Sequence, residues 1–312
     1  MSIYRKGLKD RECDKEASQN SCPEQATLVQ AQGASEDENF EKGPTLSKTD
    51  FSDPFSIALC ILGVTGKMGA CLLSVACKDP SVRIVSGTGR PCATAIGKDL
   101  GSLLGNEELG VCIQDNAKQA LAHCSVAVDF SVHEAVLEHV CAAREAKKAL
   151  LIGTTGLSDK DLRAIEEASR VIPIALSSNF SLGIALCLEA ACAWGGVLFG
   201  RSTIDIHETH HVHKKDRPSG TALSLARAIG KGKIVSEGFA SPRNFEEIAI
   251  YSTRHEEVVG EHRLVFDCGQ ECIEIKHVAH SREAFAQGAL IAAKALAAKP
   301  AGLYAFKDLY GN

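Results

Sequence analysis

The apolar run Ile57–Leu62, followed by Gly63-Val-Thr-Gly66-Lys-Met-Gly69, is the feature that most constrains the fold. A short apolar run that ends in a glycine turn is typical of a parallel strand buried on both faces. Residues 70–76 have the composition of a helix. This order predicts the first unit of a nucleotide-binding sheet, with a pyrophosphate on the helix N-terminus. An ordinary strand-to-helix turn is the alternative, because the glycine spacing is a variant of the dinucleotide fingerprint.

The segment after this helix indicates which nucleotide the sheet binds. Residues 81–86 predict a second strand, and Thr88-Gly89-Arg90 follows it, where such sheets usually carry an acid for the ribose hydroxyls. An arginine without that acid favours a cofactor with a 2′-phosphate.

Strand and helix patterns alternate further along the chain, which predicts a doubly wound parallel sheet up to about Asn179. A long helix from Leu182 follows, and the later strands suggest a mixed or antiparallel sheet. An Ala-rich helix at 282–298 ends the series. The other expected elements are strands at 125–130, 149–153, 172–176, 203–207, 248–252, 263–267 and 272–278, and helices at 134–146 and 159–169.

The stretch Glu208–Thr221 places titratable side chains close together. If residues 207–212 form a strand, Glu208 and His210 point to one face, with Lys214 a further step along it. An imidazole that titrates near neutral pH then lies beside an ammonium group, which suits a general acid and a charge partner.

An anion-binding turn follows directly. Pro218 and Gly220 predict a tight turn, and a helix is expected to begin at Thr221. The first backbone N–H groups of a helix are unpaired and carry the positive end of its dipole, so they bind a carboxylate or a phosphate. Proton donors and an anion cradle together indicate an active site.

Three other interpretations stay open from this stretch alone. Its histidines would suit a metal site, because imidazole is the commonest side-chain ligand, although no carboxylate or Cys lies where a third ligand is expected. The stretch also fits a solvated strand end with an ordinary turn, or a phosphate-binding turn without catalysis. The histidines concerned are His207, His210, His211 and His213.

The two motifs together resemble the dihydrodipicolinate reductase family, also called 4-hydroxy-tetrahydrodipicolinate reductases. The family signature Glu-x-His-His-x-x-Lys-x-Asp-x-Pro-Ser-Gly-Thr-Ala is met at every fixed position from Glu208 to Ala222. The resemblance covers about residues 57–312. The further matching motifs are Asp129-Phe-Ser131, Gly153-Thr-Thr155, Asn179-Phe-Ser-Leu-Gly183, Gly260-Glu-His262 and Gly302-Leu-Tyr304.

The resemblance implies an α/β fold, with a Rossmann-like doubly wound parallel sheet and an inserted α+β substrate domain built on a mixed sheet. Residues 56–181 plus 282–312 would form the dinucleotide-binding domain, because the last segment of the family returns to it. Residues 182–281 would form the substrate-binding and oligomerisation domain. We expect a homotetramer assembled through the sheets of that domain.

The implied activity is the NAD(P)H-dependent reduction of 4-hydroxy-tetrahydrodipicolinate to tetrahydrodipicolinate with loss of water, in the diaminopimelate route to lysine. The substrate is a small cyclic dicarboxylate, and the cofactor is NADPH, with NADH as the alternative. His210 and Lys214 are the expected proton donors, and His211, Gly220 and Thr221 the expected substrate ligands. The expected cofactor-binding residues are Gly63, Val64, Thr65, Gly66, Lys67, Met68, Arg90, Gly153, Thr154, Thr155, Ser177, Ser178, Asn179 and Phe180. No metal is expected.

Two departures from the family pattern bear on these expectations. In the family loop Arg-x-Gly-x-x-x-Gly-x-His, Arg254, Gly260 and His262 are kept, but Glu256 stands where glycine is usual. Gly89 replaces the acid that many members place before the arginine, which shifts the expected preference toward NADPH.

Composition argues for a cytoplasmic enzyme with a separate leader. Residues 1–55 hold 7 Lys and Arg against 11 Asp and Glu, which is most of the net charge of −5, and their polar composition predicts a disordered or loosely docked segment. They match neither a signal nor a transit peptide. The thirteen cysteines include no Cys-x-x-Cys pair, so free thiols in a reducing cytoplasm are expected, although Cys268 and Cys272 are candidates for cross-strand neighbours. We expect no membrane or nucleic-acid partner.

Two other functional classes fit the sequence less well. A semialdehyde dehydrogenase needs a nucleophilic Cys, and none of the thirteen stands in such a motif. A catalytically silent cofactor-binding sensor would show damage to the acid and the cation, whereas His210 and Lys214 are both present.

Overall fold

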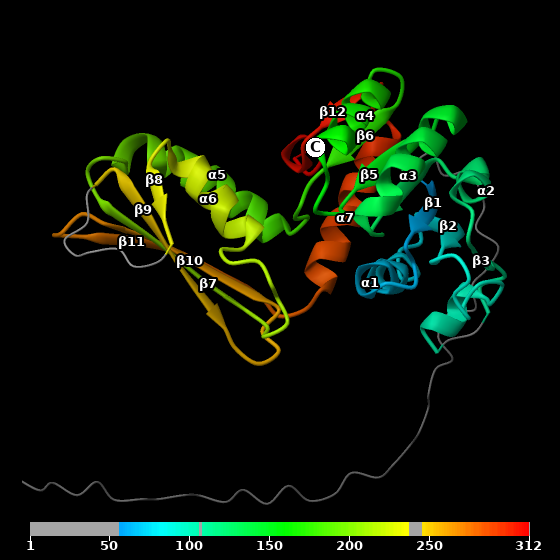
Figure 1. Ribbon diagram of the computed structural model, residues 1–312, viewed down its shortest axis with the longest axis horizontal. Helices are drawn as coiled ribbons and strands as arrows, with labels where there is room; N and C mark the ends of the chain where they lie inside the picture. The colour runs from blue at the N-terminus through cyan, green and yellow to red at the C-terminus, as the bar shows by residue number, and fades with distance from the viewer. Residues whose placement is uncertain (1–55, 106–107, 237–244, 312) are drawn as a thin grey trace, which may run out of the picture. The chain divides into compact units, whose positions relative to one another are not determined.

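The computed structural model describes residues 56–105, 108–236 and 245–311, which form two sheets with their helices (Figure 1). The predicted leader, residues 1–55, lies outside the described residues. One sheet has seven strands and the other has five.

The seven-stranded sheet has the order β12-β6-β5-β4-β1-β2-β3, and all its pairings are parallel. The strand order reverses between β1 and β4, and ligands of such sheets bind at this switch point, outside the carboxyl ends of the strands. The strands are β1 (Ile57–Leu62), β2 (Val82–Thr88), β3 (Ile113–Gln114), β4 (Val126–Asp129), β5 (Ala149–Ile152), β6 (Pro173–Leu176) and β12 (Gly302–Tyr304).

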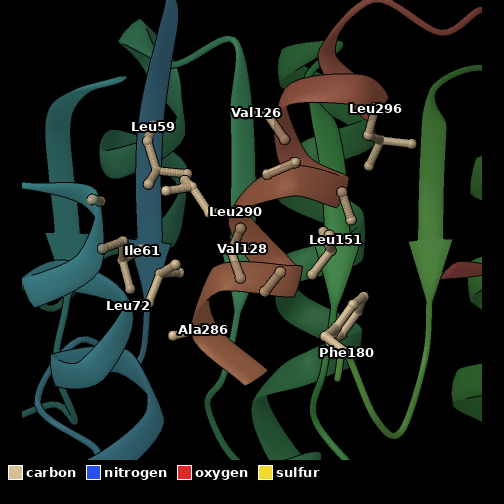
Figure 2. Close-up of a cluster of buried hydrophobic side chains, with 14 of the residues drawn as sticks. Leu59, Ile61, Leu72, Val126, Val128, Leu151, Phe180, Ala286, Leu290 and Leu296 are labelled. Atoms are coloured by element: carbon tan, nitrogen blue, oxygen red, sulfur yellow. The ribbon is translucent and has the colours of Figure 1, made fainter. Parts of the chain in front are cut away.

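Helices cover both faces of this sheet because its strands are apolar on both sides. On one face, Leu59 and Ile61 of β1 pack with α1 and α7, and Figure 2 shows α7 lying across β4 and β5 with Leu290 directed into this core. On the other face, Cys60 and Leu62 of β1 contribute to a second core with α2, α3 and α4. The helices are α1 (Lys67–Ala76), α2 (Ala117–Ala120), α3 (His133–Ala146), α4 (Asp159–Ser169) and α7 (Glu283–Ala297).

The five-stranded sheet has the order β11-β10-β7-β9-β8. It is mixed, because β10 pairs antiparallel with β7 and β11 while β9 pairs parallel with β7 and β8. Helices α5 and α6 cover one of its faces, where Ile206, Leu225 and Phe266 are buried together. The elements are α5 (Leu182–Leu198), β7 (Thr203–His210), α6 (Gly220–Ile229), β8 (Lys233–Val235), β9 (Glu247–Arg254), β10 (Gly260–Asp267) and β11 (Cys272–Ala279).

The predicted fold class is confirmed, while several predicted boundaries are wrong. The first helix begins at Lys67 rather than at residue 70, because Gly66 already serves as its N-cap. The strand expected at 207–212 ends at His210. The domain boundaries stay a prediction, which is supported by α7 and β12 packing on the seven-stranded sheet.

The structure bears on the predictions for the cysteines and for a membrane segment only within the described residues. The cysteines among the described residues are free, and Asp267 rather than Cys268 is the register partner of Cys272. The backbone N–H of Cys268 instead donates to the Glu271 carbonyl, which closes the hairpin. None of the described helices has the length and apolar character needed to cross a membrane.

Candidate active site

The glycine turn after β1 leaves its backbone open to a ligand. Gly63 has φ +82°, and a Cβ there would lie 2.8 Å from the Phe130 carbonyl oxygen. A Cβ on Gly69 would lie 2.2 Å from the Gly63 carbonyl oxygen. Only glycine therefore fits both positions, and α1 starts beside the turn with its first N–H groups available to an anion.

A hollow of about 230 Å³ lies at this turn. Gly63, Thr65 and Gly66 line it from the β1 loop, and Gly89 and Arg90 line it from the end of β2. The structure therefore brings the expected phosphate-binding turn and the expected 2′-phosphate ligand to one cavity. Lys67 is exposed at the start of α1, Met68 is half-buried, and the Val64 side chain is fully buried in the core, so only its backbone can meet a ligand.

A buried carboxylate organises the loops around this hollow. Asp129, at the end of β4, is fully buried and accepts hydrogen bonds from Nδ1 of His139 at 2.7 Å, from Thr154 Oγ1 at 2.9 Å and from the Ser131 hydroxyl. Burial alone would raise the pKa of Asp129, but the hydrogen bonds from His139 and Ser131 outweigh it and lower the pKa. The ionised Asp129 thus ties the loops that follow β4 and β5.

The loops after β5 and β6 hold the remaining predicted cofactor residues. Thr154 is buried and turned toward Asp129, so a ligand can meet only its backbone, whereas the neighbouring Thr155 is exposed. A Cβ on Gly153 would clash with the Phe130 ring at 2.2 Å. Phe180 is 2% exposed and packs edge-on against Phe130 and Phe306, which leaves no free ring face for a nicotinamide.

Residues at the end of β6 connect to the second sheet's helix. The Ser177 hydroxyl donates to the Asn179 carbonyl at 2.7 Å, while Ser178 is exposed. The Asn179 amide donates to Oγ1 of Thr221 at 3.0 Å, at the first turn of α6. One expected cofactor residue therefore contacts one expected substrate residue.

Glu208 and His210 lie on the buried face of β7, as their alternation predicted. Nδ1 of His210 is hydrogen-bonded to Oε2 of Glu208. Burial by itself would raise the pKa of Glu208, but hydrogen bonds from His210, Ser252 and Arg254 lower it to about 2. An ionised carboxylate can only accept, so Nδ1 carries the proton and Nε2 is the nitrogen that can exchange one with a ligand.

Sheet register explains which residues surround this pair. In the β7–β9 pairing His210 lies opposite Arg254, and in the β7–β10 pairing Glu208 lies opposite His262. A Cβ on Gly260 would lie 3.2 Å from Nε2 of His210, so a side chain there would crowd the imidazole.

Lys214 reaches the site from a turn, and its predicted place on the strand face is wrong because β7 ends four residues earlier. Its ammonium lies 3.0 Å from Oδ2 of Asp216, and its side chain is 25% exposed. Burial would raise the pKa of Asp216, but the hydrogen bond and charge of Lys214 lower it. The Arg217–Pro218 peptide bond in this turn is cis.

The turn leads into α6 through Ser219, which caps the helix by accepting from the Ala222 N–H at 3.2 Å. Its own backbone N–H donates to Oε1 of Glu208 at 3.3 Å. Gly220 and Thr221 form the first turn of α6, as predicted, so the anion cradle and the Glu208–His210 pair share a direct contact.

His262 is a buried neighbour of this pair, and its recognised motif carried no predicted role. Its ring lies 5.1 Å from that of His210, edge to face, and burial followed by the charge of His210 lowers its pKa to about 3. Its Nε2 lies 3.4 Å from the Ser219 hydroxyl, and its buried Nδ1 has no hydrogen-bond partner in the described part of the chain.

The four histidines of the metal interpretation do not converge. His207 lies on the opposite face of β7, stacked on Tyr251 at 4.6 Å, and His213 is exposed. His211 is half-buried, and its Nδ1 is buried without a partner among the described residues, so it remains available to a ligand.

A different group, Glu208, His210 and His262, has ligand atoms within 4.8 Å of one another. The residues present do not fit a metal site well, because Glu208 Oε2 is already hydrogen-bonded to His210 and Oε1 to a guanidinium. A metal ion would have to replace the Glu208–His210 hydrogen bond and would lie next to the guanidinium of Arg254.

Comparison with known families accounts for nearly all of the described chain. The model described as "Dihydrodipicolinate reductase, N-terminus" matches residues 57–180, and "Dihydrodipicolinate reductase, C-terminus" matches residues 183–310. The chain belongs to the dihydrodipicolinate reductase family.

Relatives in this family are similar over most of their length. A 4-hydroxy-tetrahydrodipicolinate reductase from Methanopyrus kandleri is 40% identical over 274 residues, which is 82% of this chain and 98% of the relative. Another from Anaeromyxobacter dehalogenans strain 2CP-1 is 38% identical over 261 residues, which is 80% of this chain and 96% of that relative. A solved dihydrodipicolinate reductase from Paenisporosarcina sp. TG-14, described as dipicolinate-bound, superposes with a TM-score of 0.66 at 20% identity, covering 80% of this chain and 97% of that one, and shares the fold.

Several residues that organise this site were missed from the sequence. Asp129, Asp216 and His262 lay in recognised motifs without a role, while His139 gave no separate signal. Glu256 does have a local explanation: its φ is +41°, a region that favours glycine, which accounts for glycine being usual at this position of the family loop.

Proposed function

We propose that this chain reduces 4-hydroxy-tetrahydrodipicolinate to tetrahydrodipicolinate with loss of water, in the diaminopimelate route to lysine. The observation that carries the proposal is the buried Glu208–His210 pair joined to the N-terminus of α6 through Ser219. This arrangement combines a proton donor with an anion cradle, as reduction of a cyclic dicarboxylate requires. Relatives that carry this activity in their names cover 80% or more of the chain.

The residues at the switch point fit a nicotinamide dinucleotide. The Gly63 turn and the start of α1 would hold the pyrophosphate, since a Cβ at Gly63 or Gly69 would fill the space that the turn requires. Backbone groups of Gly153 and Thr154, with the exposed Thr155, lie at the carboxyl end of β5, and Ser177 to Phe180 lie at the end of β6. When bound, the cofactor supplies a hydride to the substrate.

NADPH is the preferred cofactor in this proposal. Arg90 lines the hollow beside Gly63 and is exposed, so it is free to pair with a 2′-phosphate. Gly89 offers no carboxylate, and a Cβ there would lie 3.1 Å from Thr65 Cγ2 and 3.3 Å from Ile96 Cδ1. An acidic side chain for the NADH ribose would therefore need these neighbours to shift.

His210 and Lys214 divide the proton and charge chemistry. His210, held at Nδ1 by Glu208, delivers a proton through Nε2 to the substrate carbon next to the one that is reduced. Lys214 is the second donor candidate and a carboxylate partner, which requires the substrate to replace Asp216 at its ammonium group. The backbone of Gly220 and Thr221, with the half-buried His211, would hold the substrate's carboxylates. No metal ion takes part in this proposal.

A homotetramer in the cytoplasm completes the proposal. The face of the five-stranded sheet opposite α5 and α6 carries the stacked rings of His207 and Tyr251. Along β7, residues of this face alternate with the buried residues of the other face. A second sheet of the same kind would cover it. Light scattering that finds only monomers at micromolar concentration would argue against this assembly.

A steady-state assay tests the activity. NADPH absorbance is followed with substrate that the preceding synthase produces freshly, and the expected result is NADPH consumption that depends on both the synthase and this protein. If NADPH absorbance stays constant although the synthase is active and this protein is folded, the proposed reaction is wrong. A semialdehyde substrate run in parallel tests the other dehydrogenase class.

A further inference from the structure

One arginine contacts both halves of the proposed proton-delivery apparatus. Arg254, the last residue of β9, donates from Nη1 to Oε1 of Glu208 at 3.0 Å and from Nε to the Lys214 carbonyl at 3.2 Å. Its Nη2 donates to the carbonyl of Asp216. The Arg254 side chain is 4% exposed, so most of its guanidinium is shielded from bulk water.

The contacts with the turn hold a segment that has no regular structure. Residues 211–219 lie between the end of β7 and the start of α6. The carbonyls of Lys214 and Asp216 are both fixed by the one guanidinium, two residues apart. The backbone that carries the Lys214 ammonium is therefore anchored to β9, the parallel neighbour of β7.

The contact with Glu208 acts on the other proton donor. Oε1 accepts from Arg254, while Oε2 of the same carboxylate is bonded to Nδ1 of His210. A carboxylate held at both oxygens keeps its plane fixed, and the imidazole bonded to it keeps its orientation.

We propose that Arg254 is a positioning residue that sets His210 and Lys214 in one geometry, so that both donors face the same bound substrate. The proposal rests on the proposed reductase function. A planar fork with several donors suits this task, because one cation meets a carboxylate on one side and two carbonyl oxygens on the other. A lysine keeps the charge but not the fork, so charge and geometry are separable.

Three variants test this role. Arg254→Gln removes the charge and the fork, Arg254→Lys retains the charge alone, and Lys233→Gln serves as control because it removes only an exposed ion pair with Glu247, on the same strand as Arg254. We expect Arg254→Gln to lower kcat by about 10²-fold and Arg254→Lys by about 10-fold, with the KM for NADPH changed by less than about twofold. Lys233→Gln should match the unmodified enzyme.

Hydrogen–deuterium exchange gives a readout that does not need activity. In Arg254→Gln the amides of residues 211–219 should exchange faster, while those of β1 and α1 should not change. Unchanged exchange at 211–219, or full kcat in Arg254→Lys, would overturn the positioning role. If the unmodified protein reduces no substrate but the turn is released in Arg254→Gln, the anchoring of the turn stands and the reductase function falls.

Discussion

Nδ1 of His210 is bonded to the carboxylate of Glu208, two residues earlier on the same buried face of β7. Because the pKa of Glu208 is lowered to about 2, the carboxylate is ionised throughout the neutral range and fixes the imidazole with its proton on Nδ1. Glu208 therefore holds His210, the proposed acid, in one orientation. This relationship leads to the first prediction.

Glu208→Gln should lower kcat by roughly 10- to 100-fold, because a neutral amide no longer stabilises the imidazolium and permits either ring orientation. Cofactor binding should not change, since Glu208 lies on the five-stranded sheet and the glycine turn on the other. Stopped-flow measurement of kcat, with NADPH fluorescence titration for binding, checks this. A variant with normal kcat would show that Glu208 serves only the fold.

Removal of either proposed donor should reduce turnover by roughly 10²-fold or more, which is the usual contribution of general acid catalysis. We expect this for His210→Ala and Lys214→Ala, with NADPH affinity nearly unaltered. Steady-state kinetics with saturating cofactor give the comparison. Loss of NADPH binding with full turnover at saturation would require both roles to be reassigned.

In the proposed function, cofactor choice depends on Arg90, which lines the hollow at the switch point. Arg90→Ala should raise the KM for NADPH by about 10- to 150-fold, corresponding to a charge-assisted pair of roughly 1.5 to 3 kcal/mol, and should leave the KM for NADH nearly unchanged. Parallel assays with both cofactors measure the ratio. Equal kcat/KM for NADPH and NADH in the unmodified enzyme would refute the preference itself.

Acid should destabilise the protein through His262, whose pKa falls from 6.5 to about 3 on burial. Below pH 6.5 the unfolded chain takes up a proton that the folded chain does not, so this contribution to stability is present above pH 6.5 and is lost as the pH falls. Between pH 8 and pH 5, the free energy of unfolding of the unmodified protein should fall by about 2 kcal/mol more than that of His262→Asn. Urea unfolding at the two pH values measures the difference, and parallel losses would contradict the assignment.

Glu256→Gly should stabilise the fold by about 1 kcal/mol or less, because φ +41° is unfavourable for a residue with a Cβ and free for glycine. The gain is limited, since glycine loses more backbone entropy on folding. The Glu256 side chain is exposed, so little else changes. Thermal unfolding should show a slightly higher Tm for the variant, and a lower one would mean that the side chain itself contributes to the turn.

Local sequence patterns predicted the parts of the site whose geometry is set within one element. The alternation along β7 puts Glu208 and His210 on one face, and the Ser219 cap starts α6 where the Pro-Ser-Gly turn indicated. The strand β1 and helix α4 were predicted with their observed bounds, because a continuous apolar run and a capped amphipathic pattern are local signals.

Contacts between distant segments were out of reach of the same reasoning. The segment that carries Lys214 was expected to continue the strand. Its position is fixed instead by hydrogen bonds that its carbonyl groups accept from Arg254, forty residues further along the chain. His262 comes next to Glu208 only through the register of β10 on β7. A shift of one residue in that register would turn His262 to the other face.

The sequence by itself thus determined most of the strands and helices, although not β3, β8, β12 or α2, together with the glycine turn and the signature residues. It did so because periodicity and turn chemistry are properties of neighbouring residues. Only the tertiary structure decided which nitrogen of His210 is held, how Asp129 joins the loops after β4 and β5, and that Arg254 bonds to both Glu208 and the backbone of Lys214. These features depend on strand order, register and burial, which come from the packing of segments that are far apart in the chain.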